Sequence, residues 1–285
     1  MFHNNLRSRA AASLTALIIW SFILIAGSLP ADAYSSKSAA KRAAQAAMPA
    51  SDPQAVVFAA QSIAALTNGT SINDVTLTGS VIWTVGSDTE TGTGTLLALG
   101  TGESRMNLAL KEGTRSEIRD ASTGRAIGQW IAPNVVPGLF ASQNCATDAA
   151  WFFPALGSLT GGPGVVFLYI GQETRNGVSV QHLQTYQYQA TEIQGLGPTL
   201  QVLSTMDFYL DATTLLPTAI VYNAHPDDNA LYNIPIEVDF SEYQAMSGVT
   251  VPTHIQRYLQ GTLAVDFTVT NATFNTGLTN STFAI

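Results

Sequence analysis

Between residues 200 and 269 the chain repeatedly places an apolar residue at every second position and separates these runs by turns. A period of two gives each strand one apolar and one polar face, which is typical of an antiparallel sheet covered on a single side. The apolar members of the three runs are Leu200, Val202, Met206, Phe208 and Leu210; Ile234, Ile236, Val238 and Phe240; and Leu263, Val265, Phe267 and Val269. The pattern predicts β-strands, the first of which begins at Leu200.

The same alternation runs through the first half of the chain. Turn residues separate short segments of alternating polarity, which predicts a meander of hairpins. In the segment 114–120 we expect Arg115, Glu117 and Arg119 to face solvent and Ile118 to face the core. Strands are expected over residues 75–85, 97–99, 106–110, 114–120, 124–131, 165–170 and 178–188.

A helix is predicted before the first strand, and a long insertion interrupts the strands later. Asp52 can cap the helix, Pro53 suits its first turn, and Asn68-Gly69 can end it. Residues 133–164 contain four prolines and the aromatic cluster Trp151-Phe152-Phe153. Because an apolar insertion must lie against other apolar groups, we expect it to plug the open side of the sheet. The alternative is a lid over a ligand cavity.

The first 33 residues have the composition of a secretory signal peptide. Arg7 and Arg9 precede an apolar run, and residues 31–33 (Ala-Asp-Ala) fit the small-x-small cleavage pattern. The run has about 12 strongly apolar residues, whereas a membrane span needs roughly 20. We therefore expect a periplasmic or extracellular protein that is cleaved after residue 33 and has no lipid anchor. Residues 34–52, rich in Ala, Ser, Lys and Gln, are interpreted as a flexible tether, and residues 53–285 as a single β domain.

The expected mature chain, residues 34–285, is acidic. It contains 10 basic and 19 acidic residues and has a net charge of −9. Such a surface argues against nucleic acid as a partner and against electrostatic adsorption to anionic lipid. The single cysteine, Cys145, cannot form an intramolecular disulfide, and we expect it to be a small buried side chain.

Motifs for catalysis or metal binding are weak in this sequence. His182, His225 and His254 have neither the H-E-x-x-H pattern nor i, i+4 ligand spacing, and there is no G-x-S-x-G motif. Several carboxylates between residues 207 and 239 alternate with core positions, as the solvated side of a sheet does. We expect a non-enzymatic protein without a cofactor or a metal ion.

Four short motifs carry a family resemblance. Asp207-Phe208-Tyr209-Leu210-Asp211 is followed by Leu215-Leu216-Pro217, then by Phe240-Ser241-Glu242-Tyr243 and Gly248-Val249-Thr250-Val251-Pro252. In order and spacing these segments resemble the outer-membrane lipoprotein carrier and sorting-protein superfamily (LolA/LolB-like), most clearly over residues 205–270. The resemblance implies an α+β, mostly β fold. A curved antiparallel sheet would form a half-open barrel, with helices covering its concave face.

The resemblance also implies a function. In carriers of this superfamily the concave cavity takes the acyl chains of lipoproteins, and an arginine lies inside it. Arg105 occupies a comparable early strand, but alternation places it opposite Met106, Leu108 and Leu110, so we expect it to be exposed. The expected cavity and lid residues are Trp83, Leu97, Leu99, Met106, Leu108, Leu110, Trp151, Phe152, Phe153, Leu156, Met206 and Phe208.

We therefore expect a monomeric, periplasmic binding or carrier protein for a hydrophobic ligand, either a lipid or the acyl chain of a lipoprotein. An envelope protein-interaction or stress-sensor module on the same fold is the first alternative, in which the partner is another envelope protein. A secreted hydrolase is a more distant alternative. A packed core and a lipid cavity require the same apolar residues, so the sequence pattern does not distinguish them.

Overall fold

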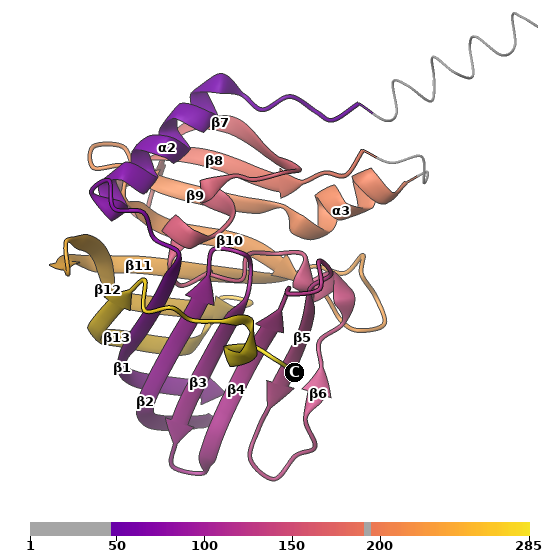
Figure 1. The fold of residues 1–285 in the computed structure, drawn as a ribbon, viewed down its shortest axis with the longest axis vertical. Coiled ribbons are helices and arrows are strands. Elements are labelled where there is room, and N and C mark those ends of the chain that lie inside the picture. Colours follow the sequence, from indigo (N-terminus) through magenta and orange to yellow (C-terminus); the bar gives the residue numbers. More distant parts are fainter. Residues whose placement is uncertain (1–46, 191–194) are drawn as a thin grey trace, which may run out of the picture. The chain divides into compact units, whose positions relative to one another are not determined.

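The computed structural model describes residues 47–190 and 195–285, and its strands form one curved antiparallel sheet (Figure 1). The expected signal peptide and all of the expected tether before residue 47 lie outside the described residues. The first six strands are β1 (Asp74–Val85), β2 (Asp88–Leu99), β3 (Ser104–Leu110), β4 (Gly113–Asp120), β5 (Ile127–Ile131) and β6 (Gly138–Leu139). The next seven are β7 (Val165–Arg175), β8 (Val178–Gln187), β9 (Met206–Asp211), β10 (Pro217–Ala224), β11 (Ile234–Met246), β12 (Val249–Leu259) and β13 (Thr262–Phe274).

The sheet consists of two meanders joined through the first and the last strand. Its order is β6-β5-β4-β3-β2-β1-β13-β12-β11-β10-β9-β8-β7, so β1 pairs with both β2 and β13. The edge strands β6 and β7 do not pair with each other, and the sheet therefore stays open. The predicted hairpin meander and the open, mostly β architecture are both confirmed.

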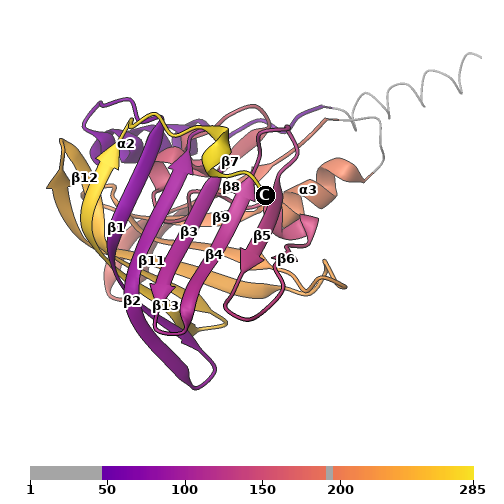
Figure 2. The same cartoon turned by 60° about the horizontal axis from the view of Figure 1, so that its bottom comes forward.

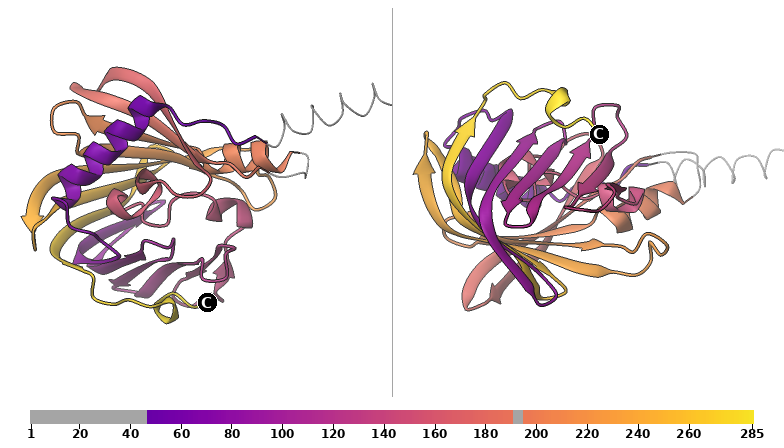
Figure 3. Two further views of the ribbon diagram at one scale, coloured as in Figure 1. Left: turned by 45° about the horizontal axis from the view of Figure 1, so that its top comes forward. Right: turned by 90° about the horizontal axis from the view of Figure 1, so that it is seen from below.

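The helix predicted before the first strand is also confirmed. α2 spans Pro53–Thr67, and the side chain of Asp52 caps it by accepting a hydrogen bond from the backbone of Gln54. Ala55, Ala59 and Leu66 are buried in the main core, which places this helix over the concave face of the sheet (Figure 3). No helix in the described part of the chain combines the length and apolar character that a membrane span requires.

The insertion lies within the curve of the sheet (Figure 3). It contains three short 3-10 turns, η1 (Ser142–Cys145), η2 (Pro154–Leu156) and η3 (Ser158–Thr160). Phe152 is 1% exposed and Phe153 is 0% exposed, and both belong to the main core. The expectation that this insertion plugs the sheet is confirmed, because its aromatic side chains occupy the space that an empty barrel would leave open.

The predicted strand start at Leu200 is wrong. Helix α3 spans Leu196–Ser204, and β9 begins only at Met206. Leu196, Leu200 and Leu203 recur at helical spacing, and the hydroxyl of Ser204 donates to the carbonyl of Leu200 at 2.5 Å. Alternation of Leu200 with Val202 spans too few residues to separate a strand from a helical turn.

The C-terminal segment after β13 crosses the convex face of β1 to β4 (Figure 2). The carboxylate of Asp74 accepts hydrogen bonds from the backbone of Thr276, Gly277 and Leu278, which anchors the start of this segment. Near its end, Phe283 is 0% exposed. A part of the convex face is therefore buried, and this affects which apolar residues face the interior.

Candidate functional site

The concave face of β4 carries charged side chains. The register pairs Met106 with Glu117 and Leu108 with Arg115, and Met106 and Leu108 both belong to the main core. Arg115, Glu117 and Arg119 therefore face the interior, contrary to the expectation from their polarity. Ile118 lies on the convex face and is nevertheless 3% exposed, so both faces of β4 are covered here.

An ion pair joins two distant strands across the concave face. The guanidinium of Arg257 on β12 donates to the carboxylate of Glu117 at 2.8 Å and lies over the ring of Trp151, 5.0 Å from its centroid. Burial lowers the pKa of Arg257, but the Glu117 carboxylate and Tyr222 raise it to a net value above the ordinary one. Burial also raises the pKa of the Tyr222 hydroxyl. Arg257 is therefore a fixed cation inside a largely apolar face.

Arg119 on β4 connects the sheet to the insertion through hydrogen bonds. Its Nε and Nη2 atoms donate to the carbonyl of Cys145 at 3.2 and 2.8 Å, and its Nη1 atom donates to the carbonyl of Gly102. Burial lowers the pKa of Arg119, and the nearby carboxylates of Asp148 and Glu103 oppose this change. Cys145 itself is 5% exposed, as its sequence context predicts.

Asp148 fixes the shape of the insertion. Its two carboxylate oxygens accept hydrogen bonds from the backbone of Ala150 at 2.9 Å and of Ser158 at 2.8 Å. A Cβ atom at position 157 would lie 1.8 Å from one of these oxygens, so this turn requires Gly157. Burial raises the pKa of Asp148, although both hydrogen bonds and Arg119 lower it.

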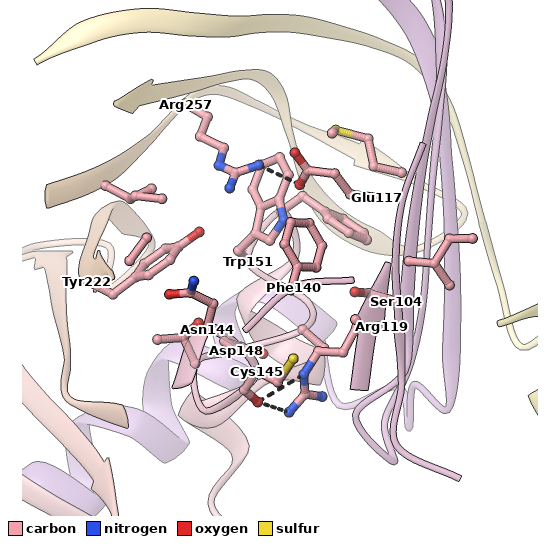
Figure 4. A pocket seen from close by; sticks show the side chains of 18 of the residues that line it. Ser104, Glu117, Arg119, Phe140, Asn144, Cys145, Asp148, Trp151, Tyr222 and Arg257 are labelled. Carbon is pink, nitrogen blue, oxygen red and sulfur yellow. Dashed lines mark hydrogen bonds and ion pairs between the residues drawn. The ribbon is translucent and has the colours of Figure 1, made fainter. Parts of the chain in front are cut away.

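Between the insertion and the sheet lies a cavity of about 150 Å³ (Figure 4). Its walls are formed by β3, β4, β5, β10, β11 and β12 on the sheet side and by residues 140–152 on the other. Arg257, Glu117 and Tyr222 approach it from one side, and Asn144, Cys145 and Arg119 from another. The apolar side chains that line it are Met106, Phe140, Trp151, Phe152 and Ile236.

A second, more open hollow adjoins this cavity. Arg119 and Cys145 line both, so the two hollows meet at this hydrogen-bonded pair. The second hollow also includes Arg125, Ser142 and Gln187. A separate charged cluster lies further along β4, where Arg115 lies 3.9 Å from the ring centroid of Trp83 and 3.6 Å from Glu90; it lines neither hollow.

The twelve residues expected to contact a ligand are distributed over four environments. Three line the cavity: Met106, Trp151 and Phe152. Five are packed in the core and line neither hollow: Leu108, Phe153, Leu156, Met206 and Phe208. Two are partly buried at the margin of the core: Trp83 and Leu110. The remaining two, Leu97 and Leu99, lie on the other face of β2.

The placement of Leu97 and Leu99 in the cavity is wrong. Residues 96–99 are all apolar, so alternation alone does not show which pair faces inward. Leu96 and Ala98 belong to the core and pair with strand β1, while Leu97 pairs with Arg105 on the convex side. Arg105 donates to the carbonyl of Thr282 at 3.0 Å, which confirms that it points away from the cavity.

Arg257 and Tyr222 were not identified as site residues from the sequence, although a signal was present. Val249, Val251 and Ile255 are buried on alternate positions of β12, and Arg257 continues the same series. Tyr222 follows Ile220 on β10 in the same way. A charged residue on the apolar side of a strand is rare unless it is paired, and this makes it a marker of a site.

The open antiparallel sheet, its apolar concave face and the covering helix define the class of half-barrel proteins. No protein-family model and no curated protein matches the sequence. Among solved structures, a LolA superfamily protein from Nitrosomonas europaea is similar with a TM-score of 0.52 and 11% identity, covering 81% of this chain and 97% of its own. A domain from Vibrio parahaemolyticus described as an outer membrane lipoprotein-sorting protein has a TM-score of 0.50 and 15% identity, covering 81% and 96%.

This chain has the fold of the LolA superfamily. The resemblance detected in the motifs of residues 205–270 is thereby confirmed at the level of the fold.

Proposed function

We propose that this protein binds a hydrophobic ligand, a lipid or an acyl chain, in the cavity beneath the insertion, and that it acts as a non-enzymatic carrier in the cell envelope. The observation that carries the proposal is the cavity itself. Although the insertion plugs most of the barrel, a space of about 150 Å³ remains between Met106, Phe140, Trp151 and Ile236. A domain evolved only as a scaffold gains stability by filling such a space.

The size of the cavity determines the affinity that it can supply. A water-sized group needs about 10–15 Å³ of such space, so about 150 Å³ admits on the order of ten methylene-sized groups. At about 0.8 kcal/mol per buried methylene, the gross gain is on the order of 8 kcal/mol. The cost of ordering the ligand reduces this figure, which leaves moderate and reversible binding, as a carrier requires.

Export is part of the same proposal. Residues 1–33 have the features of a cleavable secretory signal, and residues 34–52 would then tether a single domain of residues 53–285. Among the solved structures with this fold is a domain described as an outer membrane lipoprotein-sorting protein, which agrees with a place in the envelope.

Trp151 provides a direct test of this function. We expect a fatty acid with bromine on its chain to quench the tryptophan fluorescence of the purified protein, because Trp151 lines the cavity. The variant Trp151→Phe should lose most of this quenching, and Trp83→Phe should keep it, since Trp83 does not line the cavity. Equal quenching in both variants, or no uptake and no co-purified lipid by mass spectrometry of a solvent extract, would refute the proposal.

Exposed apolar side chains favour a second candidate function, protein interaction. Leu231 is 89% exposed and Val136 is 84% exposed, each in a loop between two strands. If the protein takes up no acyl chain, Leu231→Ser and Val136→Ser should weaken the capture of an envelope partner without changing the Tm. Each has an exposed apolar neighbour, Tyr232 beside Leu231 and Val135 beside Val136, and clusters of such residues are a feature of interaction surfaces.

A further inference from the structure

Positive charge is concentrated at the two adjoining hollows. Residues 53–285 contain seven basic and eighteen acidic side chains, so the expected domain is strongly acidic. Three of these seven basic residues, Arg119, Arg125 and Arg257, line the cavity or the second hollow. Two carboxylates, Glu117 and Asp148, line the cavity, whereas the second hollow is lined by arginines and no carboxylate.

The second hollow has hydrogen-bond donors to offer. A guanidinium carries five N–H groups, and the carbonyls of Cys145 and Gly102 accept three of those on Arg119. Glu103 and Asp148 balance part of its charge from the protein side. Arg125 is exposed and forms no ion pair within the described residues. It can therefore turn its charge toward a ligand without losing a partner.

The two hollows differ in chemistry and meet at Arg119 and Cys145. The cavity has a mostly apolar lining that includes Met106, Trp151 and Phe152 and contains the paired Arg257 and Glu117. The charged side chains that line the second hollow are both arginines. The hollows meet where the Arg119 guanidinium donates to the Cys145 carbonyl, so the charge lies where the apolar space ends. An amphiphile has this same arrangement, because its charged group follows directly on its chain.

We propose that the ligand is a single-chain amphiphile with an anionic headgroup, whose chain occupies the cavity and whose headgroup lies against Arg119 and Arg125. The proposal rests on the proposed function and specifies its ligand class. The cavity admits on the order of ten methylene-sized groups, which is one chain and not two. A carboxylate and a phosphate monoester share the required chemistry, since both accept charge-assisted hydrogen bonds from arginine.

Binding of dodecanoate, dodecyl phosphate and dodecanol to the purified full-length chain tests this class, with isothermal calorimetry as the readout. At low salt and pH 8 we expect either anion to bind ~10-fold more tightly than the alcohol, and the difference to shrink at high salt. A preference between the two anions identifies a fatty acid or a phospholipid fragment as the natural source. The variant Arg125→Ala should weaken anion binding ~3–5-fold and leave dodecanol binding unchanged.

Lys111→Ala is the matched control, because Lys111 is an exposed cation in the turn at the other end of the β3–β4 hairpin and lines neither hollow. It should bind all three compounds as the wild type does, and Arg125→Lys should retain most of the preference for anions. Equal affinity for dodecanol and dodecanoate refutes the anionic headgroup and leaves the proposed function standing. Failure to bind any of the three compounds refutes both.

Discussion

Replacing Glu117 by Leu leaves Arg257 without its carboxylate partner in the interior of the barrel. The side chain of Arg257 is 18% exposed and that of Glu117 is 38% exposed, so the arginine is largely shielded from water and the carboxylate only in part. Breaking a fully buried ion pair costs about 3–5 kcal/mol, because one charge stays buried and uncompensated. Partial exposure of Glu117 reduces this cost, and we expect Glu117→Leu to lower the free energy of unfolding by about 2 kcal/mol.

The reasoning is tested by removing both charges together. In Glu117→Leu/Arg257→Met no unpaired charge remains, and two apolar side chains of similar volume join the lining of Met106, Trp151 and Ile236. The contact between Arg257 and the Trp151 ring at 5.0 Å is lost as well, which costs about 0.5–1 kcal/mol. We therefore expect the double variant to lie within about 1 kcal/mol of the wild type and above either single variant.

The wild type, Glu117→Leu, Arg257→Met and the double variant are compared by urea unfolding and by thermal unfolding, both followed by circular dichroism. A loss of about 2 kcal/mol corresponds to a decrease in Tm of about 4–8 °C for a domain of this size. The double variant should recover most of this decrease. If its loss equals the sum of the two single losses, the charges do not interact across the cavity, and the structural account of this pair is wrong.

Three further predictions test other parts of the fold. Phe153→Ala should lower the free energy of unfolding, measured in urea, by about 3–5 kcal/mol, because Phe153 is 0% exposed. The control Val136→Ala, at an 84% exposed position, should stay within about 0.5 kcal/mol of the wild type. Similar losses in both would contradict the conclusion that the insertion fills the core. Gly94→Ala should lower the free energy of unfolding by about 1–3 kcal/mol in the same assay, because the added Cβ atom would lie 2.4 Å from the Phe267 ring. An unchanged free energy of unfolding would show that the ring can move. Burial and the neighbouring Glu237 raise the pKa of Asp239 to about 6, so the folded protein holds a proton that the unfolded chain releases at lower pH. Stability should therefore fall as the pH rises from about 4 to 6, and Asp239→Asn should flatten this part of a Tm profile; an unchanged slope would place the titration elsewhere.

Alternation of apolar and polar residues predicted the buried face of a strand correctly where one face is buried and the other is exposed to solvent. In β9 and β11 the apolar residues Met206, Phe208, Ile236 and Val238 all belong to the core, as their alternation indicates. The hairpin meander also followed from sequence, because turn residues separate successive strands. The pairing of β1 with β13 was not predictable in this way, since it joins strands from opposite ends of the chain.

The same pattern failed where both faces of a strand are covered. On β4, Ile118 is buried on the convex face, while Glu117 and Arg119 face the interior. Polarity alone assigns the charges to solvent, because a single sequence does not show that Arg257, 140 residues away, will neutralise Glu117. On β2 the apolar run of residues 96–99 gave no preferred face. Glu117 and Arg119 of the candidate site lie at such positions, and of the cavity lining only Met106, Trp151 and Phe152 were predicted.

The insertion limits the size of the ligand that we propose for the cavity. Phe152 and Phe153 are packed in the core, and Arg119 and Asp148 fasten the surrounding backbone through hydrogen bonds. Removing one such aromatic side chain from the core costs about 3–5 kcal/mol. A ligand with two long chains would have to displace several of them, and the lost packing would offset much of the gain from burying its methylenes. The cavity beside Trp151 is present with the insertion in place, so the single acyl chain that we propose would not have to displace it.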